Sequence, residues 1–220
     1  MKAVLFDFNG TLYNDTRFHL YAWKNYLKDR FGFDLSEEEV RRRCIGPGNA
    51  LIFKDFFGED ISPELIEEYS KEKEVFYRSV CRSNPENLQL MEGAAELFDL
   101  LTERGIPFVI ATASPIENVE FYLNDLGLSK WVDIDRIVYE EGNLPGKPDP
   151  AFYLEAARRA GFAPGECIIV EDSKTGIEAA IRAGAGKLIV IDRTAPREFL
   201  ENTKEIDALI HDFRGFEKYL

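Results

Sequence analysis

The chain has 220 residues, which is enough for one well-cored domain or for a core domain with a smaller inserted one. Its 27 basic and 40 acidic side chains give a net charge of −13, which argues against nucleic acid and anionic membranes as partners, because both attract basic surfaces. The apolar runs are too short for a membrane-spanning helix and no signal-peptide pattern is visible, so we expect a soluble, cytoplasmic protein. The 3 cysteines are widely spaced, so neither a disulfide framework nor a zinc site is indicated.

The first residues predict a buried strand that ends in a carboxylate. Residues 4–6 form an apolar run typical of a parallel strand that is covered on both faces. Asp7 follows at its carboxyl end, and Asn9 and Gly10 are residue types that favour a tight loop with exposed amide N–H groups. A carboxylate beside such donors suits a group that attacks, and then carries, a phosphoryl unit.

The next part of the chain predicts helices and no strand. A first helix is expected to begin with a cap at Asp15 and to end at Gly32. A capping box at residues 36–39 opens a second helix, which is expected to run to the glycine-rich residues 46–48. A serine–proline pair at residues 62–63 starts a third. This segment therefore predicts an all-α insertion.

A strand–helix alternation follows the insertion, and its spacing predicts a parallel sheet with right-handed crossovers and helices on both faces. The expected fold class is α/β, a Rossmann-like core domain of residues 1–13 and 92–220 with an all-α cap domain of residues 14–91. The later strands are expected over residues 107–111, 136–139, 167–170 and 187–191, and the helices over residues 93–104, 114–127, 150–160 and 175–183.

Polar side chains follow several of the expected strands. They are Asp7, Thr112, Lys147 and the pair Glu171 and Asp172. Because open α/β sheets bind ligands outside the carboxyl ends of their strands, these side chains are expected to converge. A hydroxyl and an ammonium group can hold phosphate oxygens, whereas clustered carboxylates repel one another unless a hard cation lies between them. Mg²⁺ fits this set of oxygen ligands best.

Four segments resemble, in order, the four motifs of the haloacid dehalogenase superfamily. They are Asp-Phe-Asn-Gly-Thr-Leu from residue 7, Ile-Ala-Thr-Ala-Ser from residue 110, Gly-Lys-Pro-Asp-Pro from residue 146 and Val-Glu-Asp-Ser-Lys-Thr-Gly-Ile from residue 170. The helical insertion resembles the cap of the branch that contains phosphoglycolate phosphatase and β-phosphoglucomutase. The resemblance covers nearly the whole chain, and four motifs in order are a far more specific signal than any one of them.

The resemblance implies a Mg²⁺-dependent reaction through an aspartyl-phosphate. Asp7 would be both the nucleophile and a Mg²⁺ ligand, and Asn9 would offer its backbone carbonyl to the metal. Asp172 would complete the metal site, with Glu171 a ligand directly or through water. These roles agree with phosphoryl transfer, in which catalysis is mainly positioning and charge neutralisation.

The resemblance also implies which residues bind the substrate. Thr112 and the amide of Ala113 would bind the transferring phosphate, and Lys147 would neutralise charge on the nucleophile and the phosphate. In the cap, His19 has the same spacing from the nucleophile as a histidine of β-phosphoglucomutase. Residues 46–49 form either a specificity loop, which would make Asn49 a further candidate for substrate binding because binding residues are often found on loops, or only a turn between two helices.

Asn9 departs from the family pattern, in which this position is an aspartate that protonates the leaving oxygen and then activates water. An amide carries no proton in this way, and losing a general acid–base group costs about 10²–10⁴ in rate. Three explanations are open. The enzyme is slow or acts on a leaving group that needs no proton, such as that of an acyl phosphate; a nearby group such as His19 substitutes; or the residue is a change introduced to trap a complex.

The leading functional hypothesis is a Mg²⁺-dependent phosphatase of a small phosphorylated metabolite such as a sugar phosphate, acting as a monomer or weak homodimer. A phosphosugar mutase is the first rival, favoured by the cap and by His19. A dehalogenase is disfavoured because Lys147 and the acidic pair indicate a metal–phosphate site. The third alternative hypothesis is a catalytically weakened chain that binds a phosphorylated ligand or protein partner. Asn9 is the only residue that supports this hypothesis.

Overall fold

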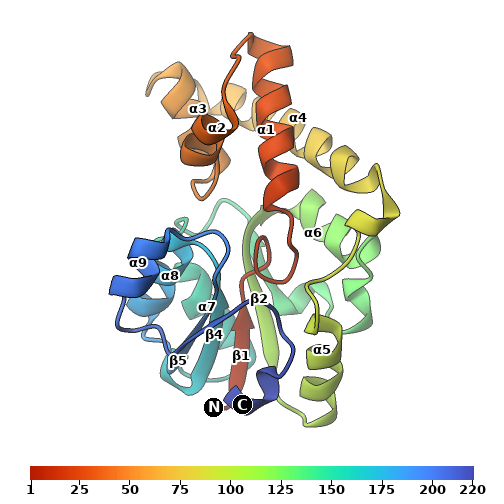
Figure 1. Cartoon of the computed structure of the whole chain (residues 1–220), viewed down its shortest axis with the longest axis vertical. Coiled ribbons are helices and arrows are strands. Elements are labelled where there is room, and N and C mark those ends of the chain that lie inside the picture. The colour runs from red at the N-terminus through yellow and green to blue at the C-terminus, as the bar shows by residue number, and fades with distance from the viewer. The chain divides into compact units, whose positions relative to one another are not determined.

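A computed structural model describes all 220 residues, and a six-stranded sheet forms its framework (Figure 1). The strands are β1 (Ala3–Phe6), β2 (Phe108–Pro115), β3 (Ile137–Glu140), β4 (Cys167–Glu171), β5 (Lys187–Ile191) and β6 (Ala208–Ile210). Their order is β3-β2-β1-β4-β5-β6, and every neighbouring pair is parallel. The predicted Rossmann-like parallel sheet is confirmed.

Strand β1 lies at the point where the strand order reverses. It pairs with β2 on one side and with β4 on the other, so that Leu5 lies opposite both Val109 and Ile169. All four residues of β1 are buried, as the apolar run predicts. Open α/β sheets bind ligands at such a reversal, outside the carboxyl ends of the strands, and the chain delivers Asp7 there.

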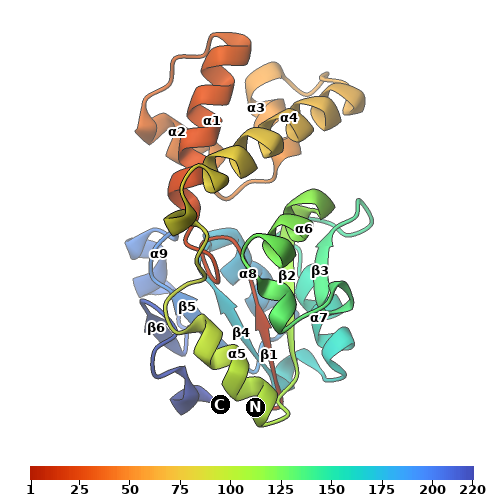
Figure 2. The same ribbon diagram turned by 90° about the vertical axis from the view of Figure 1, so that its right-hand side faces the viewer.

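Helices cover both faces of the sheet, as Figures 1 and 2 show. They are α5 (Ala94–Glu103), α6 (Ile116–Asn124), α7 (Ala151–Ala160), α8 (Lys174–Ala183) and α9 (Arg197–Asn202). Helices α7 and α8 share an apolar core with Leu5 on one face. On the other face, the Phe98 ring of α5 packs 5.6 Å from that of Phe6, between ring centroids. Alternate side chains of β1 therefore pack against the helices on opposite faces of the sheet, because successive side chains of a strand point to opposite faces.

The chain divides into two compact units, an α/β unit of Met1–Asn14 and Gln89–Leu220 and a helical unit of Asp15–Leu88. The domain boundaries predicted from the sequence, after residues 13 and 91, stay a prediction. None of the helices is both long enough and apolar enough to span a membrane.

The helical unit contains α1 (Thr16–Phe31), α2 (Glu37–Cys44), α3 (Asn49–Phe57) and α4 (Pro63–Arg82). Its apolar core includes Trp23 and Phe53. Two predicted helix starts are confirmed. Ser36 forms a reciprocal capping box with Glu39, and the Ser62 hydroxyl accepts a hydrogen bond from the amide of Leu65.

Three predictions about the elements are wrong in detail. Asp15 precedes α1 but makes no capping hydrogen bond, because its carboxylate accepts one from the Tyr77 hydroxyl instead. The second helix ends at Cys44, short of residues 46–48, and α3, which follows them, was not predicted. Ser114 does not begin a helix, because β2 continues to Pro115 and α6 begins at Ile116. Strand β6, with three residues, and α9, with six, were not predicted, because segments this short carry no clear period.

Candidate active site

The loop after β1 holds Asp7 beside β4. The amide of Asp7 donates to the carbonyl of Val170 at 2.9 Å, so pairing continues one residue beyond the strand. The chain then turns at Gly10, where φ is +80° and a Cβ atom would lie 2.1 Å from Oδ2 of Asp172. Glycine is needed there both for the positive φ and for the close approach to a carboxylate.

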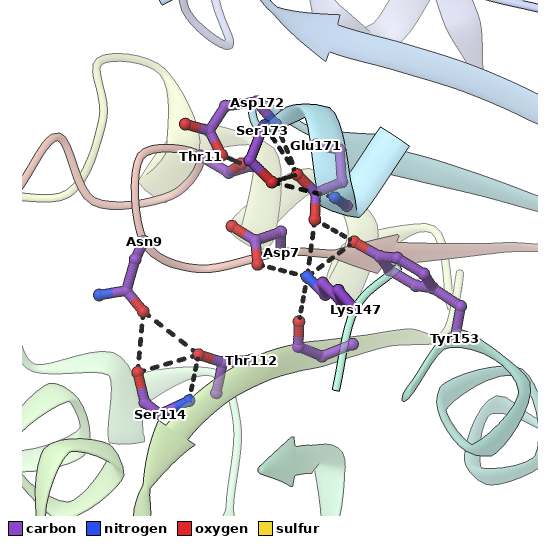
Figure 3. A network of polar contacts seen from close by, with 12 residues as sticks. Asp7, Asn9, Thr11, Thr112, Ser114, Lys147, Tyr153, Glu171, Asp172 and Ser173 are labelled. Carbon is purple, nitrogen blue, oxygen red and sulfur yellow. Dashed lines mark hydrogen bonds and ion pairs between the residues drawn. The ribbon is translucent and has the colours of Figure 1, made fainter. Parts of the chain in front are cut away.

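Lys147 lies among four oxygen atoms at the centre of the site (Figure 3). Its Nζ is 2.6 Å from Oδ1 of Asp7 and 2.6 Å from Oε1 of Glu171. The Tyr153 hydroxyl at 3.1 Å and the Ala111 carbonyl at 3.2 Å complete the set. Burial lowers the pKa of Lys147, but the adjacent charges of Asp7 and Glu171 outweigh it and raise the pKa above its usual value. Lys147 is therefore a permanent cation that joins the two carboxylates.

Both carboxylate oxygens of Glu171 are engaged within the protein. Oε1 accepts hydrogen bonds from Lys147 and from Tyr153, the latter at 2.8 Å. Oε2 accepts from the amides of Asp172 and Ser173 at 2.8 and 3.0 Å and from the Ser173 hydroxyl at 3.1 Å. Burial raises the pKa of Glu171, but Lys147 and these bonds outweigh it and lower the pKa below its usual range. Glu171 thus connects Lys147 to the start of α8.

Asp7, Glu171 and Asp172 form a buried acidic cluster in which one possible ligand atom from each lies within 4.8 Å of the others. Burial, together with the charge of Glu171, raises the pKa of Asp7 to about 7 despite Lys147. Burial and the charges of Glu171 and Asp7 likewise raise the pKa of Asp172 well above its usual range. One ammonium group therefore does not balance three carboxylates, and this oxygen set fits a hard divalent cation such as Mg²⁺.

Thr112 and Ser114 lie at the end of β2 and contact the side chain of Asn9 (Figure 3). Thr112 Oγ1 is 3.2 Å and Ser114 Oγ is 2.8 Å from Oδ1 of Asn9. Ala113, between them, is exposed. The α/β unit thus brings Asp7, Asn9, Thr112, Lys147, Glu171 and Asp172 to the carboxyl edge of one sheet, as expected.

His19 and Asn49 lie in the helical unit, and each takes part in a polar network there. The His19 ring stacks on that of Tyr77, with centroids 4.0 Å apart, and its Nε2 is 3.3 Å from Oδ2 of Asp15. The Asn49 amide donates to Oε1 of Glu74 at 2.9 Å. The substrate-binding roles expected of His19 and Asn49 stay predictions.

The hydroxyl groups that organise the site are not apparent from the sequence. Tyr153, which contacts both Lys147 and Glu171, lies in the first turn of α7, and its place shortly after the third motif is the signal that could have found it. Tyr122, whose hydroxyl is 2.8 Å from Nδ2 of Asn9, has no comparable signal, because only the packing of α6 against the loop after β1 brings it there.

Replacing Tyr153 by phenylalanine is expected to lower the free energy of unfolding by about 1.5–3 kcal/mol, the usual contribution of a hydrogen bond to a charged group such as the Glu171 carboxylate. The hydroxyl is lost while Lys147 and Glu171 remain paired. Urea denaturation measures the change, with the exposed Tyr21→Phe as the control, for which at most about 0.5 kcal/mol is expected. An equal loss of stability in both variants would contradict the role assigned to Tyr153.

A family model described as haloacid dehalogenase-like hydrolase matches residues 1–184. The chain belongs to this family. Its sequence is 26% identical over 192 residues to the phosphorylated carbohydrates phosphatase of Thermotoga maritima, covering 86% of this chain and 84% of the relative. It is 28% identical over 188 residues to the β-phosphoglucomutase of Bacillus subtilis, covering 84% and 80%. Among solved structures, a haloacid dehalogenase hydrolase of family IA from Entamoeba histolytica is similar with a TM-score of 0.89 and 37% identity, over 97% of this chain and 94% of that one.

Proposed function

We propose that this member of the haloacid dehalogenase family is a Mg²⁺-dependent phosphatase of a small phosphorylated metabolite, acting through a phosphoryl group carried on Asp7. The observation that carries the proposal is the position of the Asp7 carboxylate at the carboxyl edge of the sheet, 2.6 Å from the Lys147 ammonium and inside the acidic cluster. The similarity to a phosphatase named for phosphorylated carbohydrates supports a sugar phosphate as the substrate class.

Mg²⁺ would be held by Asp7, Asp172 and the backbone carbonyl of Asn9, where it would neutralise charge on the phosphoryl oxygens. Glu171 has both oxygens engaged, so a direct bond from it to a metal would replace a hydrogen bond to Lys147, Tyr153 or the start of α8. We therefore assign Glu171 chiefly to holding Lys147, with any metal contact made through water.

The side chains around the acidic cluster would orient the nucleophile and bind the phosphoryl group. Lys147 orients Asp7 and offsets the negative charge that gathers as nucleophile and phosphate approach. Thr112 and the amide of Ala113 would bind the non-reacting phosphoryl oxygens. In this arrangement an oxygen of Asp7 attacks phosphorus, the bond to the leaving group breaks, and water later releases phosphate from Asp7.

Phosphate release from a panel of phosphate esters and acyl phosphates, with and without Mg²⁺, tests the proposal. We expect Mg²⁺-dependent release from at least one class of substrate. If neither the native chain nor Asn9→Asp releases phosphate from any of them in Mg²⁺, the proposed function is wrong.

A mutase is the second candidate, because the chain is also similar to a β-phosphoglucomutase. A mutase returns the phosphoryl group to a second hydroxyl of the sugar, so it yields an isomerised phosphosugar without free phosphate. Product analysis by NMR with glucose 1-phosphate as substrate separates the two reactions.

Metal-free protein is expected to lose stability as the pH rises from about 4 to about 7. The pKa of Asp7 rises from 3.8 to about 7 on folding, so between these values the folded state binds more protons than the unfolded state. This contribution is present at low pH and is lost as the pH passes through the folded-state pKa. Thermal unfolding in EDTA at several pH values measures it.

Mg²⁺ is expected to reverse this trend, because it competes with protons for the same carboxylates. At one hundred times its dissociation constant, it should add about 2.7 kcal/mol. Asp172→Asn should remove this gain, whereas the exposed Asp60→Asn should keep it. An equal gain in both variants would place the metal elsewhere.

A further inference from the structure

The Asn9 side chain takes part in a closed ring of hydrogen bonds with Ser114 and Tyr122. Its Nδ2 donates to the Tyr122 hydroxyl at 2.8 Å, and the Ser114 hydroxyl donates to its Oδ1 at 2.8 Å. The Ser114 and Tyr122 oxygens are 3.0 Å apart, which closes the ring. Tyr122 and Ser114 are buried, with 1% and 8% of their surfaces exposed, and the Tyr122 ring stacks on Phe8 at a centroid distance of 4.0 Å.

The number of hydrogen-bond donors decides which side chain at position 9 suits this ring. With asparagine, the amide donates to the phenol, the phenol donates to the serine, and the serine donates to the amide oxygen, so each edge holds one hydrogen. An ionised aspartate only accepts, so both hydroxyls would turn toward it, and the 3.0 Å edge between Ser114 and Tyr122 would lose its hydrogen. The partners on β2 and α6 therefore fit an amide better than a carboxylate.

The side chains in and around the ring do not include a good general acid. Hydroxyl groups of Thr112, Ser114 and Tyr122 contact the Asn9 amide and one another. The carboxyl groups nearby form the acidic cluster, which serves as nucleophile, as metal site and as partner of Lys147. The hydroxyl groups beside Asn9 are weak acids, the phenol with a pKa of about 10 in its usual range, so they are poor general acids at neutral pH.

Building on the proposed function, we infer that the site takes phosphoryl compounds whose leaving group departs as a weak base, acyl phosphates above all. A carboxylate needs no proton at neutral pH, because the pKa of a carboxylic acid is about 4. A primary alkoxide is a strong base and depends on general acid help, whose absence costs about 10²–10⁴ in rate. Anomeric phosphosugars, whose leaving oxygen is less basic than a primary alkoxide, come between the two.

The first step is balanced without an acid. An oxygen of Asp7 forms a bond to phosphorus, and the bond from phosphorus to the acyl oxygen breaks, with its electron pair leaving on the carboxylate. In the second step a water oxygen attacks phosphorus, the bond to Asp7 breaks, and the protons of that water pass to phosphate and solvent. Because no carboxylate at position 9 takes a proton from the water, the phosphoenzyme forms faster than it decays.

Single-turnover phosphorylation of Asp7 in Mg²⁺, followed by acid quenching and mass spectrometry, tests the inference with acetyl phosphate and glycerol 3-phosphate. Acetyl phosphate is intrinsically more reactive, so the decisive quantity is how the ratio of the two rates changes with the residue at position 9. Asn9→Asp should speed the reaction of glycerol 3-phosphate by about 10²–10⁴-fold and that of acetyl phosphate by less than about tenfold. Asn9→Ala, which also carries no proton, should keep the native ratio, and circular dichroism verifies that each variant is folded.

The outcomes separate this inference from the function on which it rests. If Asn9→Asp speeds both reactions equally, or if the native chain uses glycerol 3-phosphate as fast as acetyl phosphate, the inference is overturned while phosphorylation of Asp7 stands. If neither donor labels Asp7 in any variant, although the substrate panel gives Mg²⁺-dependent phosphate release, the inference is overturned while the proposed function stands. If the panel gives no release either, the proposed function fails as well. A phosphoenzyme that forms from acetyl phosphate and decays slowly in the native chain, but quickly in Asn9→Asp, supports the inference.

Discussion

Asp7→Asn is expected to lower phosphoryl transfer by at least about 10⁴-fold, because removing a catalytic nucleophile has effects of this size or larger. The variant should fold, since an amide has the shape of the carboxylate and its Oδ1 can still accept the hydrogen bond from Lys147. Metal-free Asp7→Asn should be at least as stable as the native chain at pH 8. The reason is that burial and Glu171 raise the pKa of Asp7, so the ionised carboxylate is costly to hold there.

Two measurements on the same preparation test this pair of expectations. Phosphate release from the best substrate of the panel gives the activity, and urea denaturation in EDTA gives the free energy of unfolding. The Asp60→Asn variant, which changes an exposed carboxylate, should retain both native values. Activity within tenfold of native in Asp7→Asn would remove Asp7 from the nucleophilic role.

Lys147→Met is expected to lower the free energy of unfolding by about 3–5 kcal/mol, the usual cost of removing one partner of a buried ion pair. The Lys147 side chain is 8% exposed and is 2.6 Å from each of two carboxylates, of which Glu171 is fully buried. Without the ammonium group, these carboxylates would remain in the site with no cation to balance them. Phosphoryl transfer should also fall steeply, since Asp7 would lose the group that orients it.

The control for this variant is Lys71→Met, because Lys71 pairs with Glu67 on the surface and is 64% exposed. A surface pair of this kind contributes at most about 1 kcal/mol. The double variant Lys147→Met with Glu171→Gln should lose less stability than the sum of the two single variants, because it leaves no charged partner behind at Glu171. Strict additivity would show that the two side chains do not act as a pair.

Much of the core of the site could be predicted from local sequence patterns. Apolar runs that end in polar residues indicated where Asp7, Thr112 and Asp172 would emerge, because the period of a buried strand and the end of that strand are local properties. The strand–helix alternation predicts parallel strands, and the carboxyl ends of parallel strands lie at the same edge of a sheet. The start of α2 was equally accessible, since the capping box at Ser36 is contained within four residues.

Other features had no local pattern. The cap expected at Asp15 did not form, because Tyr77, 62 positions further on, donates to its carboxylate instead. Ser114 resembled a helix cap, but β2 continues through it and its hydroxyl contacts Asn9. In both cases a hydrogen bond to a distant residue prevailed over a short-range preference.

The family can be inferred from the amino-acid sequence, and so can the order and chemical type of the residues around the acidic cluster, because each motif and each hydrophobic period spans only a few residues. The hydrogen-bond partners of those residues cannot be inferred from the sequence. Whether Glu171 serves a metal or holds Lys147, and whether Asn9 is a defect or one member of a hydrogen-bonded ring, depends on hydroxyl groups of Tyr153, Ser114 and Tyr122. Buried polar atoms need hydrogen-bond partners, and these partners come from segments that are distant in the sequence. They lie close together only after the sheet and its helices have packed.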